Sequence, residues 1–230
     1  TLGFDFKDYG GIPKNKKAMN GKGMTFADTT VNEKAGYALI QQSFNNGIVL
    51  NAGYRIENHS VYGNEYIPSA GIAYYFSNCT TIKASVSKGF RSPTIRELFL
   101  FTPANSNLKP ERVTNYEIGL MQKLFADKLG LEITIFKADG ENMIQTVYSG
   151  GVPKNVNTGS FKNHGLEFSA KFNQNNSLNY ILNYTYIKMK NPVLATPEHS
   201  IYLGTNYTFN KFNINLGLQN ITNLITNLIL

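Results

Sequence analysis

The chain has 230 residues, a net charge of +7 at pH 7 and a single cysteine, Cys79. No run of about 18 apolar residues is present, which excludes a transmembrane helix, and one cysteine excludes a disulfide framework. The positive charge could favour nucleic acid, but the basic residues form no stripe with interleaved aromatic side chains. We therefore expect no nucleic-acid partner.

One cluster of basic residues lies near the N-terminus, in a glycine-rich segment. It consists of Lys14, Lys16, Lys17 and Lys22. Because runs of like charge usually serve solubility, we expect a solvated loop. The alternative is contact with an anionic ligand or with lipid phosphates at the cell surface.

Apolar and polar residues alternate with a period of two along most of the chain, which predicts β-strands. In residues 48–57, for example, Ile48 and Leu50 share one face, and Arg55 and Glu57 share the other. Many of these runs reach the 9–11 residues that cross a bilayer, whereas ordinary strands have about five or six. We expect one helical turn at most, in residues 92–101. The expected strands are eleven, at 1–8, 30–44, 48–58, 66–77, 80–90, 112–124, 128–147, 158–173, 177–190, 199–209 and 212–219.

The expected connections alternate between short and long. The short ones are 45–47, 77–80, 125–128, 173–176 and 210–211; the long ones are 9–29, 59–65, 91–111, 148–157 and 190–198. Outer-membrane barrels have this arrangement, with the tight turns in the periplasm, whereas a soluble sandwich has loops of mixed length at both ends. The sequence therefore predicts an all-β fold, an antiparallel up-and-down transmembrane β-barrel.

Two segments carry a family resemblance. Residues 86–99 read Val-Ser-Lys-Gly-Phe-Arg-Ser-Pro-Thr-Ile-Arg-Glu-Leu-Phe, and residues 105–120 read Asn-Ser-Asn-Leu-Lys-Pro-Glu-Arg-Val-Thr-Asn-Tyr-Glu-Ile-Gly-Leu. Together they resemble the signature late in the barrel of TonB-dependent outer-membrane receptors, where a strand descends behind an Asn-x-x-Leu-x-Pro-Glu segment. Residues 157–167 and 218–223 are similar to later parts of that family, although Thr222 and Asn223 depart from its pattern.

The resemblance implies a partial barrel, about 11–12 strands of a probable 22, with residues 1–230 as the C-terminal part of the barrel domain. The plug domain and the N-terminal half of the barrel would be absent from this sequence. The implied protein is a receptor of the Gram-negative outer membrane that imports a scarce nutrient, such as a ferric siderophore, haem or cobalamin. Import would proceed by ligand binding on external loops and energy-coupled gating. The implied partners are the nutrient, outer-membrane lipid and lipopolysaccharide, and TonB through the missing N-terminal part; no cofactor is expected.

Two other interpretations remain open at this point. One is a small porin-like barrel of about twelve strands, without a plug, that allows passive diffusion, since bacterial single-chain barrels have even strand numbers. The other is an outer-membrane barrel hydrolase. The chain has neither a GxSxG nucleophile elbow nor an HExxH helix, so we expect no enzyme.

Candidate ligand contacts are aromatic and charged residues on the expected external loops. They are Arg91, Arg96, Tyr62, Tyr66 and Tyr148. Both arginines could bind a carboxylate or phosphate of a ligand through two hydrogen bonds. We favour the alternative, in which they pair with Glu97 or Glu111 and hold the loop.

The three histidines, His59, His164 and His199, lie in or beside expected long loops. A metal site would need all of them to converge, which spacing along the chain does not indicate. We therefore expect solvent-exposed histidines and no metal site.

Overall fold

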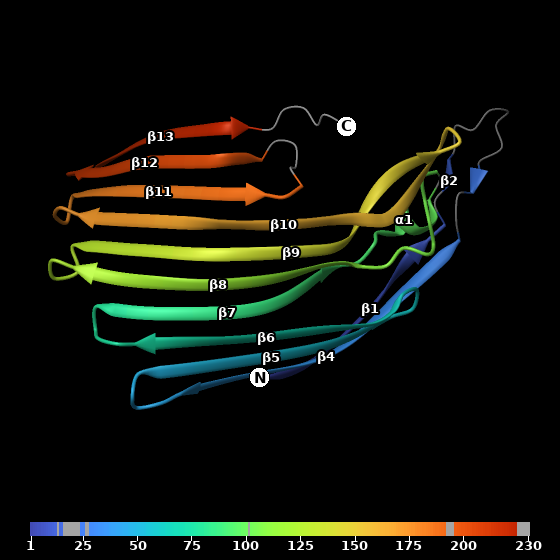
Figure 1. Ribbon diagram of the computed structural model, residues 1–230, viewed down its shortest axis with the longest axis horizontal. Helices are drawn as coiled ribbons and strands as arrows, with labels where there is room; N and C mark the ends of the chain where they lie inside the picture. Colours follow the sequence, from blue (N-terminus) through green and yellow to red (C-terminus); the bar gives the residue numbers. More distant parts are fainter. Residues whose placement is uncertain (13, 16–23, 26–27, 101, 192–195, 225–230) are drawn as a thin grey trace.

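The computed structural model describes residues 1–12, 14–15, 24–25, 28–100, 102–191 and 196–224. It contains one antiparallel sheet of eleven strands in sequential order, a two-stranded ribbon and one short helix (Figure 1). The ribbon pairs β2 (Lys14–Asn15) with β3 (Met24–Thr25), and α1 is Ile95–Phe99. The strands of the large sheet are β1 (Leu2–Gly11), β4 (Thr29–Ser43), β5 (Ile48–His59), β6 (Gly63–Tyr75), β7 (Thr80–Arg91), β8 (Glu111–Leu124), β9 (Leu129–Ser149), β10 (Val152–Asn173), β11 (Leu178–Met189), β12 (Pro197–Phe209) and β13 (Phe212–Leu224).

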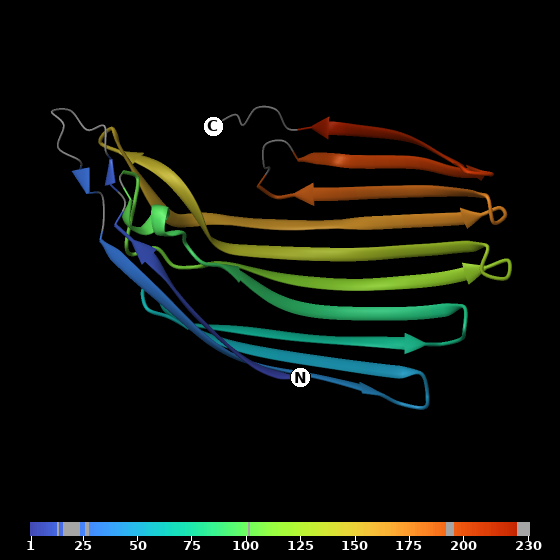
Figure 2. The ribbon, with the colours of Figure 1, turned by 180° about the vertical axis from the view of Figure 1, so that it is seen from behind.

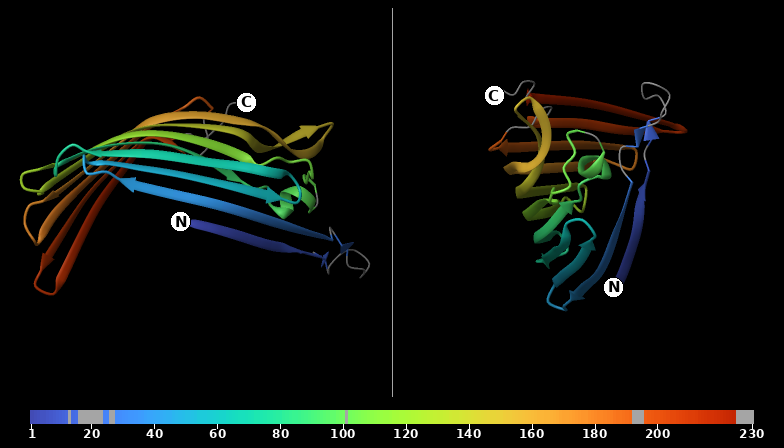
Figure 3. Two further views of the ribbon diagram at one scale, coloured as in Figure 1. Left: turned by 90° about the horizontal axis from the view of Figure 1, so that it is seen from below. Right: turned by 90° about the vertical axis from the view of Figure 1, so that its right-hand side faces the viewer.

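The large sheet confirms the predicted fold class and its eleven strands. All five short turns lie together at one end of the sheet, and the other connections lie at the opposite end (Figures 1 and 2). The sheet is curved but not closed, because β1 and β13 are its two edges (Figure 3). Helix α1 lies on the concave side of the sheet. In the described part of the chain, no helix could span a membrane.

Two connections that were predicted to be long are in fact tight, and those predictions were wrong. Strands β9 and β10 continue to Ser149 and Val152, so only Gly150 and Gly151 form the turn. Both glycines have positive φ, 60° and 81°, the conformation that a two-residue hairpin requires and that glycine adopts without strain. β5 and β6 are likewise joined by residues 60–62 alone. The 21 residues of β9 span about 70 Å at 3.3 Å per residue, well beyond the roughly 30 Å of a bilayer core.

The two faces of the sheet differ in polarity. Large apolar side chains alternate with polar ones, and on one face they are exposed, as with Leu50, Ile56, Ile118 and Ile135. In the described part of the chain, the buried hydrophobic side chains are few: Val31, Ala35, Leu98, Leu108 and Met189. An exposed apolar face with a small core fits a sheet that lipid covers on one side. Such a sheet can lie in lipid because its backbone groups pair between neighbouring strands. We call the apolar face the outward face and the opposite one the inner face.

Candidate functional site

The polar residues of interest gather at the long-loop end of the sheet, on and above the inner face. On the outward face, apolar side chains of β1, β5 and β6 end at Phe6, Ile56 and Tyr66. The next outward positions toward the loops are polar: Asp8, Asn58 and Asn64. The strand ends and loops beyond this level therefore lie outside the membrane-spanning part.

Arg91, the last residue of β7, binds two carboxylates of the loop between β7 and β8 and of the start of β8. Its guanidinium donates to both carboxylate oxygens of Glu97, at 3.0 and 3.1 Å, and to Glu111 at 2.5 Å. Glu111 also accepts the backbone N–H of Ile144 on β9 at 2.7 Å. This pairing is the alternative favoured from the sequence, and through it Arg91 holds the loop.

A capping box begins α1 and uses the same glutamate. The Thr94 hydroxyl accepts the Glu97 N–H at 3.2 Å, and the Glu97 carboxylate accepts the Thr94 N–H at 2.7 Å. Burial disfavours the charged carboxylate, but hydrogen bonds from Arg91 and Thr94 hold the pKa of Glu97 below its usual value. Glu97 therefore stays ionised and joins the helix to the end of β7.

The Asn-x-x-Leu-x-Pro-Glu segment fastens this loop to β10. Asn105 donates to the backbone oxygen of Asn155 at 2.7 Å, and the Asn155 N–H donates to the backbone oxygen of Pro103 at 2.8 Å. Asn157 accepts the Lys109 N–H and donates to the Lys109 oxygen, both at 2.8 Å. The side chains of Leu108 and Pro110 are buried beneath. The motif was visible in the sequence, but Asn155 and Asn157, its partners on β10, were not predicted to hold the loop.

A second cluster lies where β1, β4 and β5 end. Tyr9 donates to Glu33 at 2.6 Å, and the fully buried His59 lies 3.6 Å from the same carboxylate. The ring of His59 stacks on that of Tyr62, with centroids 3.9 Å apart and planes 10° from parallel. His59 Nδ1 accepts the backbone N–H of Val61 at 3.1 Å, so a neutral His59 carries its proton on Nε2, facing Tyr9 and Glu33.

The expectation of a solvent-exposed His59 was therefore wrong. The turn of residues 60–62 is tight, and it folds Tyr62 over the imidazole, which the expected seven-residue loop would not do. Burial lowers the pKa of His59, against the attraction of Glu33 and Glu57. His59 is thus a neutral, packed residue of the inner face.

Two arginines bind acidic residues of the same region of the inner face. We call this region the charged wall; it consists of Asp5, Tyr9, Glu33, Arg55, Glu57, His59, Glu65 and Arg112. Arg55 donates to Asp5 at 2.5 Å and to Glu57 at 2.7 Å. Arg112 binds both oxygens of Glu65, at 2.8 and 2.5 Å, although β6 and β8 are not neighbours in the sheet. Glu57 and Glu65 are buried, so these arginines balance charges that water does not reach.

Of the five candidate ligand contacts, three gather around the β7–β8 loop. Arg91 and Arg96 flank the start of α1, and the Tyr62 hydroxyl lies 2.7 Å from Ser92 Oγ. Tyr66 faces outward beside Ile56, and Tyr148 is exposed near the tip of the β9–β10 hairpin. Among the basic cluster near the N-terminus, Lys16, Lys17 and Lys22 lie outside the described residues. Across the described residues, no group of three or more His, Cys, Asp and Glu side chains could hold a metal.

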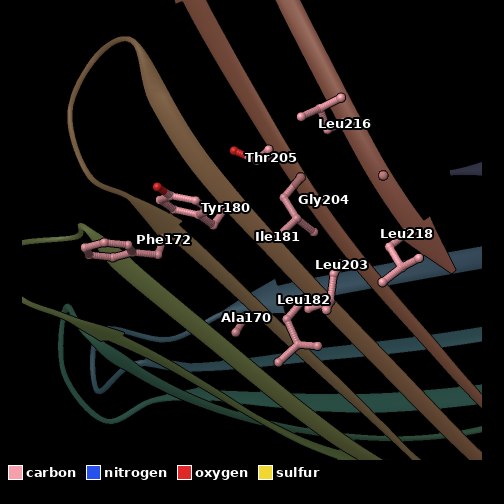
Figure 4. Close-up of a pocket in the computed structure, with 11 residues that line it drawn as sticks. Ala170, Phe172, Tyr180, Ile181, Leu182, Leu203, Gly204, Thr205, Leu216 and Leu218 are labelled. Carbon is pink, nitrogen blue, oxygen red and sulfur yellow. The ribbon is translucent and has the colours of Figure 1, made fainter. Parts of the chain in front are cut away.

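Two apolar hollows lie on the outward face. One, of about 540 Å³, crosses β10 to β13 (Figure 4) and is lined by Ala170, Phe172, Tyr180, Ile181, Leu182, Leu203, Gly204, Thr205, Leu216, Gly217 and Leu218. The other, of about 670 Å³, crosses β4 to β7. Because both open on the face that lipid covers, neither is suited to a polar nutrient. A polar hollow of about 300 Å³ lies on the inner face, lined in part by Glu132, Glu167 and Asn183.

Comparisons with known proteins agree with this architecture. Residues 1–225 match the family described as TonB dependent receptor-like, beta-barrel. The vitamin B12 transporter BtuB of Vibrio vulnificus is 24% identical over 163 residues, which are 69% of this chain and 26% of that protein. The iron-regulated outer membrane virulence protein of Vibrio cholerae is 26% identical over 203 residues, 74% of this chain and 29% of that protein. The chain thus spans between a quarter and a third of these relatives.

Solved structures show the same fold. A variant of the ferric enterobactin receptor PfeA of Pseudomonas aeruginosa superposes with a TM-score of 0.75 at 17% identity, covering 95% of this chain and 38% of that one. The siderophore receptor PirA of Acinetobacter baumannii gives a TM-score of 0.73 at 19% identity, covering 86% and 34%. The sheet, its curvature and its sequential order are therefore those of a receptor barrel.

Proposed function

We propose that this chain, which belongs to the β-barrel family of TonB-dependent receptors and so to the bacterial outer membrane, is the C-terminal part of a receptor that imports a scarce nutrient. The observation that carries the proposal is the open sheet together with the family match over residues 1–225. Within the residues that the structure describes, strands β1 and β13 each have one unpaired edge. A row of unpaired N–H and C=O groups in lipid is very costly. Further strands, those of an N-terminal half of the barrel, would satisfy both edges.

The names of the relatives support the proposed nutrient class. The relatives are named for vitamin B12, for ferric enterobactin and for iron regulation. We infer that the nutrient is a bulky, scarce compound of this kind: a ferric siderophore, haem or cobalamin. Import by this receptor is binding and gating without bond chemistry, with energy from TonB, which reaches the receptor through its N-terminal part.

The clamped β7–β8 loop supports a division of labour among the candidate contacts. Arg91 holds the loop through Glu97 and Glu111. Tyr62 connects the β5–β6 turn to this loop through Ser92. Arg96 on α1 and Tyr148 near the end of β9 are proposed ligand contacts because of their place on the external loops. A rigid loop presents such side chains without an ordering cost on binding, which favours affinity.

The test is ligand binding by the full-length receptor that contains this chain, titrated separately with cobalamin, haem and ferric siderophores. One of these should bind, and Arg96→Ala should weaken it by about tenfold, the cost of one charge-assisted hydrogen bond. Lys211→Ala, in the β12–β13 turn at the opposite end, is the matched control and should leave affinity unchanged. Absence of binding to every compound would overturn the proposed nutrient class.

A further inference from the structure

The pairing of β9 with β10 is irregular near the loop end of the sheet. The register shifts between Asn157 and Gly159 and again between Gly159 and Phe161. On the facing strand Asn142 has a register partner on neither side, and its φ of 57° is one that asparagine tolerates better than most residues. Such bulges bend a strand and increase its twist, and β9 and β10 bend near their loop ends (Figure 1). We call residues 143–157, beyond this irregularity, the distal hairpin.

Side chains satisfy backbone groups of β9 at the bend. In the part of the chain that the structure describes, β8 pairs with β9 only as far as Glu141. Beyond that point the Glu111 carboxylate accepts the Ile144 N–H at 2.7 Å. The Asn157 amide donates to the backbone oxygen of Asn142, also at 2.7 Å. Because an unpaired, poorly solvated backbone group is costly, these two side chains stabilise the bend in one conformation.

The Asn157 side chain connects three segments. Its oxygen accepts the Lys109 N–H at 2.8 Å, and its nitrogen donates to the Lys109 oxygen at 2.8 Å as well as to Asn142. An asparagine amide has two N–H donors, and both are used here. Asn157 on β10 therefore binds β9 and the β7–β8 loop at the same point.

A second link lies closer to the tip of the hairpin. Asn105 of the β7–β8 loop donates to the Asn155 oxygen at 2.7 Å, and the Asn155 N–H donates to the Pro103 oxygen at 2.8 Å. The side chain of Asn155 is buried and accepts the Thr146 hydroxyl of β9 at 2.8 Å. The distal hairpin is thus attached to the β7–β8 loop at two levels, and the two segments form one unit.

We propose that Asn157 is a positioning residue for nutrient binding, because it fixes the distal hairpin against the β7–β8 loop. Each segment carries one proposed ligand contact: Arg96 lies on α1 in the loop, and Tyr148 lies in the distal hairpin. A bulky nutrient that touches both needs their separation to be set before it binds, since ordering them on binding costs affinity. The inference rests on the proposed function and adds the residue that sets the geometry of its contacts.

The binding test compares Asn157→Ala with Thr158→Ala in the full-length receptor, using whichever of cobalamin, haem and ferric siderophores the parent binds. Asn157→Ala removes three hydrogen bonds and should weaken binding by about tenfold. Asn157→Asp keeps the size of the side chain but loses both donors, so it should lose as much. Thr158→Ala is the matched control, because its hydroxyl donates to Gln145 of the facing strand, and its affinity should stay within about twofold of the parent.

Hydrogen exchange separates positioning from a general loss of stability. In Asn157→Ala the amides of residues 143–156 should exchange about tenfold faster than in the parent. Those of residues 166–173, on β10 below the bend, should exchange as in the parent, and the urea midpoint of the receptor should not move. In Thr158→Ala both segments should exchange within about twofold of the parent.

Faster exchange with unchanged affinity, unchanged exchange in residues 143–156, or equally faster exchange in residues 166–173 would each overturn the proposal. If Asn157→Ala does not fold, Asn105→Ala removes the second link alone and should raise exchange and weaken binding by about threefold each. A parent receptor that binds none of the compounds would contradict the proposed function. A parent that binds one of them, and binds it equally well after Asn157→Ala, would overturn this inference alone.

Discussion

The inner face differs between its N-terminal strands, β1 to β8, and its C-terminal strands, β11 to β13. On β1 to β8, carboxylates are held by arginines and tyrosines, and several of them are buried, as with Glu33, Glu57 and Glu65. On β11 to β13, a row of amides crosses the sheet in register, from Asn179 to Asn206 to Asn215. Asn206 donates to Asn179 at 2.8 Å, and β13 is exposed along its whole length.

Charge pairs fix the side chains of β1 to β8, whereas the amides of β11 to β13 leave that part of the inner face open to contact. Buried, paired charges hold their geometry firmly, because removing one partner leaves the other charge buried without a counter-charge. Neutral amides are less costly to desolvate, so another surface can cover them more easily. Tyr202 extends this neutral surface by lying across Gly204 and Gly217. A β-carbon on either glycine would come within 3 Å of the Tyr202 ring or hydroxyl. We expect the two regions to respond very differently to mutation.

The largest effect is expected in the charged wall, from Arg112→Ala. This change leaves the buried carboxylate of Glu65 without its bidentate partner and should lower the free energy of unfolding by about 3 kcal/mol. Urea unfolding of the full-length receptor in lipid vesicles measures it. Arg112→Lys keeps a charge and should lose less; a loss below about 0.5 kcal/mol for Arg112→Ala would show that the wall is not held by this pair.

A smaller loss is expected from Tyr9→Phe, which removes the hydroxyl that donates to Glu33. A hydrogen bond to a charged group contributes about 1.5–3 kcal/mol, and Lys7 still donates to Glu33, so a loss of about 1.5 kcal/mol is expected. Tyr148→Phe is the matched control, because Tyr148 is 76% exposed, and should unfold like the parent. Equal stability of the two variants would show that the Tyr9 hydroxyl does not stabilise the fold.

Acidification should weaken the charged wall through His59. The folded pKa of His59 lies below the unfolded one, so as the pH falls the unfolded chain takes up the proton first and stability is lost. Between pH 7.5 and 5.5 the loss attributable to His59 should reach at most about 1.4 kcal/mol. His59→Gln has no such proton to gain, and the same unfolding measurement should show a shallower pH dependence. An identical slope in both proteins would contradict a buried, neutral His59.

The amide row should give the smallest effect. Asn206→Ala removes one neutral, part-buried hydrogen bond and should cost about 0.5–1 kcal/mol. Its thermal or urea midpoint should therefore lie close to that of the parent. A loss as large as that of Arg112→Ala would erase the distinction between the two regions.

Much of this architecture was predictable because its signals are local. Alternation gave all eleven strands, and the charges at Arg91, Glu97 and Glu111 indicated a pairing that the structure contains. The environment of His59 was not predictable, because Tyr9 and Glu33 are remote in sequence and the packing depends on the β1–β4–β5 register. The tight turn at Gly150 and Gly151 carried a local signal, two adjacent glycines.

The proposed function makes this barrel part of an energy-coupled importer. The most direct measurement is uptake of the nutrient that the full-length receptor binds, in cells with and without TonB and with and without a proton-motive force. Uptake should stop when either TonB or the proton-motive force is removed, while binding at the cell surface persists. Uptake that continues at the same rate without both would contradict it and would indicate a passive, porin-like barrel.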